Sequence, residues 1–303
     1  VFVEDIYDEF ALGEHSPEAI REFMRSATGK WRVSPRYAIL LGDSSYDPRN
    51  YLGQVNRDLI PTKLIDTEFQ ETGSDSWLVD FNDDGIEDIA LGRLPAIDTA
   101  EANTLIQKIA RYETQAPRPV SDILVADRGF ERFNDALETE LPVGAQVSRI
   151  ERSSMTDSEM RSRIINDLNG GPMIVTYTGH GAPSLWASAN VFKSDDVAGI
   201  NNEKLSFYMM MTCLSGYNLS PNYDSLSELL LKNPDGGAIA VWSSTGTTYP
   251  DKQLEISQSL TRLMFTQNTM RLGDLVRQSK QMTTGLDVRK TWHLIGDPTL
   301  FVK

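Results

Sequence analysis

The chain of 303 residues contains one cysteine and three histidines. A single cysteine excludes an internal disulfide, so packing of the chain, or packing together with bound ions, must supply the stability of the fold. No apolar run reaches the roughly 18 residues of a membrane-spanning helix, and we expect no membrane span. Val1 opens directly onto acidic sequence and not onto a basic and then apolar leader, which favours a mature piece of a longer precursor.

Basic residues are also in deficit, with 29 Lys and Arg against 43 Asp and Glu and a formal charge of −14. Phosphate groups would be repelled by this charge, which argues against a nucleic-acid or anionic-membrane partner. Hydrophobic residues make up 40% of the chain and charged residues 24%, as in compact globular proteins. The length favours two adjoining α/β units.

The first half alternates predicted helices and strands. A helix begins after the N-cap Ser16, a buried strand occupies residues 36–43, and a second strand at 88–95 leads through Thr99 into an amphipathic helix. Pro117 and Pro119 interrupt this pattern just before a new apolar run. We therefore predict an N-terminal α/β subdomain at 1–118 and a C-terminal subdomain at 119–303.

The second half continues the alternation. We predict strands at 123–126, 145–150, 173–178, 205–212, 238–243 and 299–302. Most are separated by helical patterns, at 157–168, 226–232, 254–265 and 272–282. The predicted fold class is α/β, with mostly parallel sheets covered by helices on both faces.

Two of the predicted strands end in residues that can carry chemistry. The strand at 173–178 runs into Gly-His-Gly, which contains His180, and the strand at 205–212 runs into Cys213. The carboxyl ends of neighbouring parallel strands meet at one sheet edge, where a thiol beside an imidazole is a nucleophile with its proton acceptor. Gly181 would let the backbone approach a substrate, and its N–H and that of Cys213 could stabilise an oxyanion.

Other interpretations compete with this one. A lone cysteine after an apolar strand is more often a core residue, and a lone histidine is as often structural. His15 and His293 do not follow a strand beside a glycine. Gly42-Asp-Ser44 is similar to the start of a serine esterase, but the chain lacks the Asp-x-x-His that such enzymes need, because His293 precedes Asp297.

The segments 176–181 and 211–213 resemble the His-Gly and Cys signature of the gingipain-type cysteine peptidases. Segments 5–10, 16–21, 41–43, 88–95 and 294–300 resemble recurring segments of that family in the same order. The resemblance implies the caspase–haemoglobinase fold and a cysteine endopeptidase without a required cofactor. It also implies a secreted or cell-surface bacterial protein with protein or peptide substrates, and a pro-segment or further domains.

Carried over to this chain, the resemblance makes Cys213 the nucleophile, His180 the general acid and base, and Gly181 and Cys213 the oxyanion donors. Gingipains that cut after arginine or lysine use an acidic pocket residue, and the comparison points to residues 127–132 without assigning one. Trp186 and Asn218 lie near the dyad in sequence. By their positions after strands, the predicted substrate pocket includes Met211, Trp242, Ser243 and Ser244.

The same resemblance leaves two alternatives open. A transpeptidase or sorting protease would release the same thioester with an amine in place of water. A catalytically idle, peptidase-like binding module would keep the fold without the reaction.

An acidic loop at residues 80–88 has oxygen-bearing side chains at relative positions 1, 3, 5 and 9 and glycine at position 6. These positions are Asp80, Asn82, Asp84 and Asp88, and they match the first part of a calcium-binding loop. Leu91 stands where that pattern has its last glutamate. The sequence therefore leaves two interpretations, a structural calcium site and a solvated acidic turn.

Overall fold

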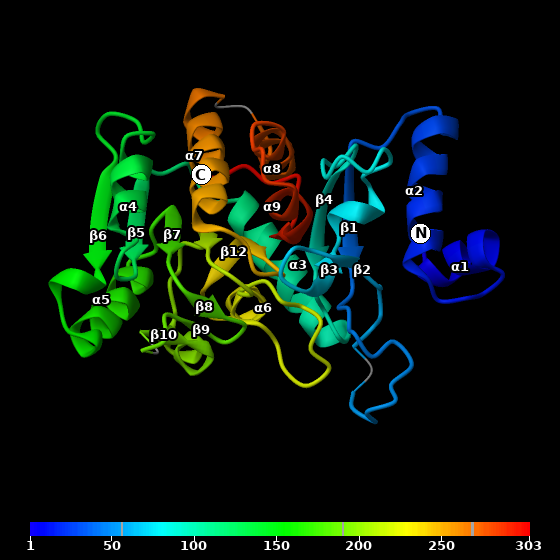
Figure 1. The fold of residues 1–303 in the computed structure, drawn as a ribbon, viewed down its shortest axis with the longest axis horizontal. Helices are drawn as coiled ribbons and strands as arrows, with labels where there is room; N and C mark the ends of the chain where they lie inside the picture. The colour runs from blue at the N-terminus through cyan, green and yellow to red at the C-terminus, as the bar shows by residue number, and fades with distance from the viewer. Residues whose placement is uncertain (56, 190, 268–269) are drawn as a thin grey trace.

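The computed structural model describes residues 1–55, 57–189, 191–267 and 270–303. Its central element is one eight-stranded sheet, seen in part in Figure 1. In spatial order the strands are β1 (Tyr37–Leu41), β4 (Ala90–Leu94), β13 (Trp292–Gly296), β12 (Ala238–Ser244), β11 (Ser206–Met211), β7 (Ile174–Thr178), β5 (Ser121–Ala126) and β6 (Gln146–Glu151). Two smaller sheets pair β2 (Lys63–Asp66) with β3 (Glu71–Ser74), and join β8 (Gly181–Ala182), β9 (Leu185–Trp186) and β10 (Phe192–Lys193).

All neighbouring strands of the large sheet are parallel except β12 and β13. The sheet therefore consists of two parallel blocks that run in opposite directions, with β1, β4 and β13 in one and the other five strands in the second. The prediction of a mostly parallel α/β fold is confirmed. Strands from both sides of the predicted boundary at residue 118 join this one sheet, because β13 pairs with β4. The division into two subdomains stays a prediction.

One predicted strand is wrong. Residues 299–302 are not in a strand, and the strand of this region is β13, which begins at Trp292. Pro298 has no backbone N–H to donate to a sheet, and Leu300 instead donates to the carbonyl of Asp297 in a turn. The carbonyl of Leu300 then accepts from Leu272, so this segment packs against the start of a helix.

Helices cover both faces of the sheet. They are α1 (Val3–Ala11), α2 (Pro17–Lys30), α3 (Thr99–Glu113), α4 (Glu131–Glu138), α5 (Asp157–Asn169), α6 (Leu226–Lys232), α7 (Pro250–Thr266), α8 (Leu272–Gln281) and α9 (Leu286–Thr291). Short 3-10 helices occupy Ser76–Leu78, Arg152–Ser154 and Ser194–Gly199. No helix of the described residues combines the length and apolar character needed to cross a bilayer.

The alternation of side chains along β11 separates two cores. Tyr208 and Met210 pack with α3, α5 and α6, whereas Phe207, Met209 and Met211 pack with α7 and α8. All five side chains are buried. The central strands are therefore apolar on both faces, and they read in the sequence as continuous hydrophobic runs.

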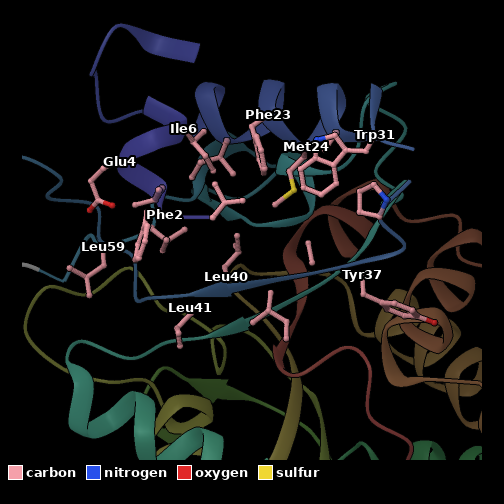
Figure 2. A pocket seen from close by; sticks show the side chains of 18 residues that line it. Phe2, Glu4, Ile6, Phe23, Met24, Trp31, Tyr37, Leu40, Leu41 and Leu59 are labelled. Atoms are coloured by element: carbon pink, nitrogen blue, oxygen red, sulfur yellow. The ribbon is translucent and has the colours of Figure 1, made fainter. Parts of the chain in front are cut away.

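The far edge of the sheet carries an apolar groove. β1 has one neighbouring strand, and the side chains of Ile39 and Leu41 are 41% and 47% exposed. Figure 2 shows Phe23 and Met24 of α2 on one side of this groove, with Leu40 of β1 below them. The groove has a volume of about 670 Å³. It lies at the opposite edge of the sheet from β6, with six strands between.

A buried carboxyl group at the start of β5 makes stability depend on pH. Asp122 is 2% exposed, its oxygens lie 3.3 Å from the hydroxyl of Thr176, and burial raises the pKa of Asp122 to about 7. A carboxyl whose pKa is raised on folding contributes stability below its unfolded pKa of about 4. That contribution is lost as the pH rises through 7.

Asp122→Asn, which keeps the shape of the neutral acid, should therefore be more stable than the wild type at pH 8.5 by up to roughly 4 kcal/mol. The advantage should shrink steadily toward pH 5. Urea unfolding of both proteins at several pH values measures it. A stability difference that does not change with pH would contradict the raised pKa.

Candidate active site

The pairing of β7 with β11 brings His180 and Cys213 to the same edge of the sheet. Thr178 is the partner of Met211, and each reactive residue lies two positions beyond that last pair. The N–H of Gly179 donates to the carbonyl of Met211 at 3.2 Å, which extends the pairing toward the two residues. The imidazole and the thiol thus follow adjacent strand ends, as the sequence predicts.

His180 has a fixed backbone and an exposed side chain. Its carbonyl accepts from the hydroxyl of Tyr177 at 2.5 Å and from the N–H of Ala187 at 2.8 Å. Its ring meets the ring of Phe130 edge to face, with 5.3 Å between centroids. The backbone anchoring leaves the imidazole open to solvent and to a substrate.

Cys213 is half-buried, and its sulfur faces polar atoms of the loop after β12. The Sγ atom lies 4.0 Å from the carbonyl oxygen of Thr248 and 3.9 Å from Nε2 of Gln253. The same Nε2 donates to the carbonyl and the hydroxyl of Thr248, both at 3.2 Å. Gln253 therefore ties this loop to the side of the thiol, a contact that is not evident in the sequence.

The residue after the cysteine has an unusual backbone conformation. Leu214 has φ = 62°, in the left-handed region that costs a non-glycine residue about 1–2 kcal/mol. Its N–H donates to the carbonyl of Gly246 at 3.2 Å. Strained residues of this kind concentrate at functional sites, where the surrounding structure holds them.

Gly181 lies against the end of β11. A Cβ atom at this position would be 2.4 Å from Oγ1 of Thr212 and 3.3 Å from the carbonyl oxygen of Cys213. Only a residue without a side chain fits at this distance. The backbone of the histidine loop therefore passes directly beside the backbone that carries the thiol.

The four residues predicted for the substrate pocket are all buried. Met211 and Trp242 belong to the core under α7 and α8. Ser243 pairs with the hydroxyl of Ser227, and Ser244 donates to the carbonyl of Gly246. Of the four, Ser244 contacts the loop after β12, and the role of all four in substrate binding stays a prediction.

The loop after β12 exposes other residues than these four. Tyr249 is 51% exposed, and its hydroxyl donates to Glu68 at 2.6 Å. Its ring packs against Phe69, with 5.0 Å between centroids. The turn between β2 and β3 therefore contributes side chains next to the loop that flanks the thiol.

Structural contacts occupy the two residues near the dyad in sequence, Trp186 and Asn218, and also Asp127. Trp186 is buried and stacks on Tyr177 at 4.5 Å, and Asn218 donates to the hydroxyl of Ser44 at 2.8 Å. Asp127, in the segment that could have held an acidic pocket residue, is buried and pairs with Arg152 at 2.9 Å. The charge of Asp127 is thus already neutralised within the protein.

A third histidine lies close to the cysteine turn, although its sequence setting gave no sign of it. Nε2 of His293, in β13, is 2.9 Å from the carbonyl oxygen of Gly216. Nδ1 is 3.4 Å from Oδ2 of Asp75, and Arg93 donates two hydrogen bonds of 2.7 Å to the same carboxylate. Burial opposes ionisation of Asp75, but Arg93 prevails and holds the pKa of Asp75 well below its usual range.

In the acidic loop the carboxylates bond to the loop's own backbone. Asp80 accepts from the N–H groups of Asp84 and Gly85, Asp84 accepts from Ile86, and Asp88 accepts from Phe81. Burial and the charges of Asp84 and Asp83 raise the pKa of Asp80. The ligand atoms of Asp80, Asp84 and Asp88 do not all lie within 4.8 Å of one another. Asn82 donates to Asp84 at 3.2 Å.

The structure also gathers three carboxylates that the sequence did not connect. Ligand atoms of Asp43, Asp224 and Glu228 lie within 4.8 Å of one another, the one such group among the described residues. Arg57 pairs with Asp43 at 3.2 Å and with Asp224 at 2.5 Å, and Lys232 pairs with Asp224 at 3.0 Å. Because two cationic side chains already neutralise the cluster, it fits a metal ion poorly.

A model of peptidase family C25 matches residues 1–303 of the chain. Gingipain R2 of Porphyromonas gingivalis is 23% identical over 153 residues, which are 46% of this chain and 21% of that protein. Gingipain R1 of the same species is 23% identical over 153 residues, 15% of its length. The matched part is therefore a small fraction of these relatives.

Solved structures agree with the family match in fold. The crystal structure of the Arg-specific cysteine proteinase gingipain R has a TM-score of 0.80 and 17% identity, and covers 98% of this chain and 70% of that one. A complex of pro- and mature domains of a gingipain of Porphyromonas gingivalis has a TM-score of 0.76 and 18% identity, and covers 98% and 72%. At identities of 17% and 18%, the similarity to these two structures shows that the chain shares their fold.

Proposed function

Because the chain belongs to peptidase family C25, we propose that it is a cysteine endopeptidase with Cys213 as nucleophile and His180 as general acid and base. The observation that carries the proposal is the pairing of Thr178 with Met211, which places both reactive residues just beyond adjacent strand ends. The exposure of His180 and the half-buried state of Cys213 leave both side chains within reach of a bound peptide.

The reaction uses groups of this edge alone. His180 accepts the thiol proton as the sulfur of Cys213 attacks the scissile carbonyl, and the N–H groups of Gly181 and Cys213 stabilise the oxyanion. The C–N bond then breaks, and His180 gives the proton to the amine that leaves. In the second half, His180 takes a proton from water as the water attacks the thioester, and the acid product and free thiol are released.

The partners and location follow from the same proposal. Protein or peptide chains are the substrates, and the chemistry needs no cofactor. We place the protein outside the bacterial cell, as the gingipain resemblance implies. A pro-segment is a further proposed partner, because a pro-domain complex occurs among the similar structures.

The proposal is tested by labelling with a peptidyl electrophile read by intact mass. We expect one label per molecule on the wild type, no label on Cys213→Ala, and a rate well above that of the same thiol in the protein unfolded by urea. Cys213 is the one cysteine, so the site of labelling is unambiguous. A wild-type rate no higher than that of the unfolded thiol would contradict the proposal.

We also propose that residues 80–88 hold a structural calcium ion. Asp80, Asn82, Asp84 and Asp88 would supply oxygen atoms. Burial and the charges of Asp84 and Asp83 raise the pKa of Asp80, and a cation would offset the part that comes from those charges. The remaining ligands would be backbone carbonyls or water, because Leu91 stands at the last position of the pattern.

Chelation should therefore lower the melting temperature, since a ligand at 100 times its Kd stabilises by about 2.7 kcal/mol. Differential scanning calorimetry with excess EDTA, followed by added calcium, measures the effect. Asp84→Asn, which weakens the loop, should melt lower and respond less to EDTA. An unchanged melting curve of the wild type in EDTA would contradict the calcium site.

A further inference from the structure

His293 lies in β13 between two groups that can only accept hydrogen bonds. Its Nε2 is 2.9 Å from the carbonyl oxygen of Gly216, and its Nδ1 is 3.4 Å from Oδ2 of Asp75. The side chain is 4% exposed, and its neighbours Trp292 and Leu294 are buried apolar residues. A polar ring at such a position is costly unless both nitrogen atoms find partners.

The hydrogen-bonding capacity of its two partners determines which ring nitrogen of His293 donates. A neutral imidazole donates from one nitrogen and accepts at the other, whereas an imidazolium donates from both. Asp75 is held as a carboxylate by two hydrogen bonds from Arg93, so it has no proton to give. The carbonyl of Gly216 can only accept as well, so the contact of 2.9 Å requires His293 to donate from Nε2.

The acceptor at Nε2 belongs to the turn that carries the thiol. Gly216 is three residues after Cys213, and its N–H donates to the carbonyl of Ser244 at 2.9 Å. A Cβ atom at Gly216 would lie 2.9 Å from Nε2 of His293, so the close approach depends on glycine. Within this turn Leu214 has the left-handed backbone described above. A turn under such strain keeps its shape only if neighbouring groups hold it.

The other side of the ring leads into the first half of the chain. Arg93 is fully buried, and beyond Asp75 it donates to the carbonyls of Gly42 and Ile60 at 2.7 Å and 2.9 Å. The contacts therefore run from the loops after β1, through Arg93, Asp75 and His293, to Gly216. This chain of buried polar groups anchors the thiol turn to a rigid part of the sheet.

We propose that His293 is a positioning residue for the reaction at Cys213, holding the carbonyl of Gly216 so that the thiol and the amide of Cys213 keep their orientation. The inference rests on the proposed peptidase function. His293 contacts neither thiol nor substrate in this role; it acts through the backbone of the turn. Small errors in the placement of reacting groups are costly, and a shift of about 1 Å can slow a reaction 100-fold.

The test compares two substitutions at the same position. His293→Leu removes both hydrogen bonds, whereas His293→Gln keeps an amide that can donate to Gly216. Labelling by a peptidyl chloromethyl ketone at increasing concentration separates the maximal rate constant from the half-saturating concentration. We expect His293→Leu to lower the maximal rate constant about 10- to 100-fold with little change in half-saturation, and His293→Gln to recover most of the loss.

Two outcomes would overturn the positioning role. One is a maximal rate constant of His293→Leu equal to that of the wild type, and the other is a His293→Gln variant that folds yet labels no faster than His293→Leu. Rapid labelling of the wild type would in both cases leave the peptidase proposal intact. A wild type that labels no faster than its unfolded thiol would instead contradict the peptidase function itself.

A measurement on the folded protein keeps the inference testable if His293→Leu does not fold. In Cys213→Ala enriched with ¹⁵N-histidine, NMR should show a slowly exchanging proton on Nε2 of His293, assigned by its absence in Cys213→Ala/His293→Gln. A ring without a proton on Nε2 would overturn the anchoring, because the carbonyl of Gly216 would then have no donor from His293.

Discussion

His180→Ala is expected to slow peptide hydrolysis by about 100- to 10,000-fold, the usual contribution of a positioned acid and base. The imidazole both takes the thiol proton and protonates the amine that leaves, so its loss slows the formation of the thioester and its breakdown. The melting temperature should hardly change, because the side chain is exposed and its described ring contact is with Phe130 alone. A fluorogenic peptide assay and a thermal melt measure the two effects.

Two matched variants serve as controls for His180→Ala. Cys213→Ser should lose activity to a similar or greater extent while keeping the shape of the side chain. His15→Ala removes a histidine that lies between α1 and α2, where it packs on Tyr7 and pairs with Asp58 at 3.5 Å. It should retain hydrolysis. Equal activity of His180→Ala and the wild type would exclude His180 as the proton carrier.

Arg93→Met is expected to destabilise the fold by about 3–5 kcal/mol, the effect of leaving one buried charge without its partner. Both members of the Arg93–Asp75 pair are nearly inaccessible, with side chains 0% and 4% exposed. Methionine has a similar length but donates no hydrogen bond, so buried Asp75 would keep only its longer contact with His293, and the carbonyls of Gly42 and Ile60 would lose the donor Arg93. Urea unfolding followed by circular dichroism measures the loss.

An exposed pair provides the control. Arg132 and Asp251 are 61% and 78% exposed, and Arg132→Met should cost less than about 1 kcal/mol because water screens the pair. Adding Asp75→Asn to Arg93→Met should recover part of the stability, since the uncompensated charge is removed. If Arg93→Met and Arg132→Met were equally stable, burial would not be what makes the Arg93 pair important.

The sequence predicted well the parts of the molecule that depend on local pattern. The apolar runs at 173–178 and 205–212 became β7 and β11, because strands buried on both faces are hydrophobic throughout. Since parallel strands end at a common edge, the pattern of apolar runs was enough to place the residues after them, His180 and Cys213, together. Residues 299–302 had a similar apolar character, but the preceding Pro298 prevents a strand there.

The parts that were not predicted depend on contacts between distant segments. His293 and Asp75 are 218 residues apart in sequence, and no spacing or motif links them. The same is true of Gln253, which reaches the thiol from α7, and of the cluster of Asp43 with Asp224 and Glu228. Such pairs form because the strand order of the sheet brings their elements together.

The place of β13 between β4 and β12 has a consequence for biosynthesis. All seven other strands of the sheet leave the ribosome before β13 does, yet β1 and β4 meet the second block of strands through it. Until β13 is inserted, β4 and β12 each present an unpaired backbone edge, which is prone to pair with other chains. Closure of the sheet is therefore a late, long-range step in folding, and it brings His293 to Gly216. A nascent chain thus lacks this contact with the thiol turn until its sheet is complete.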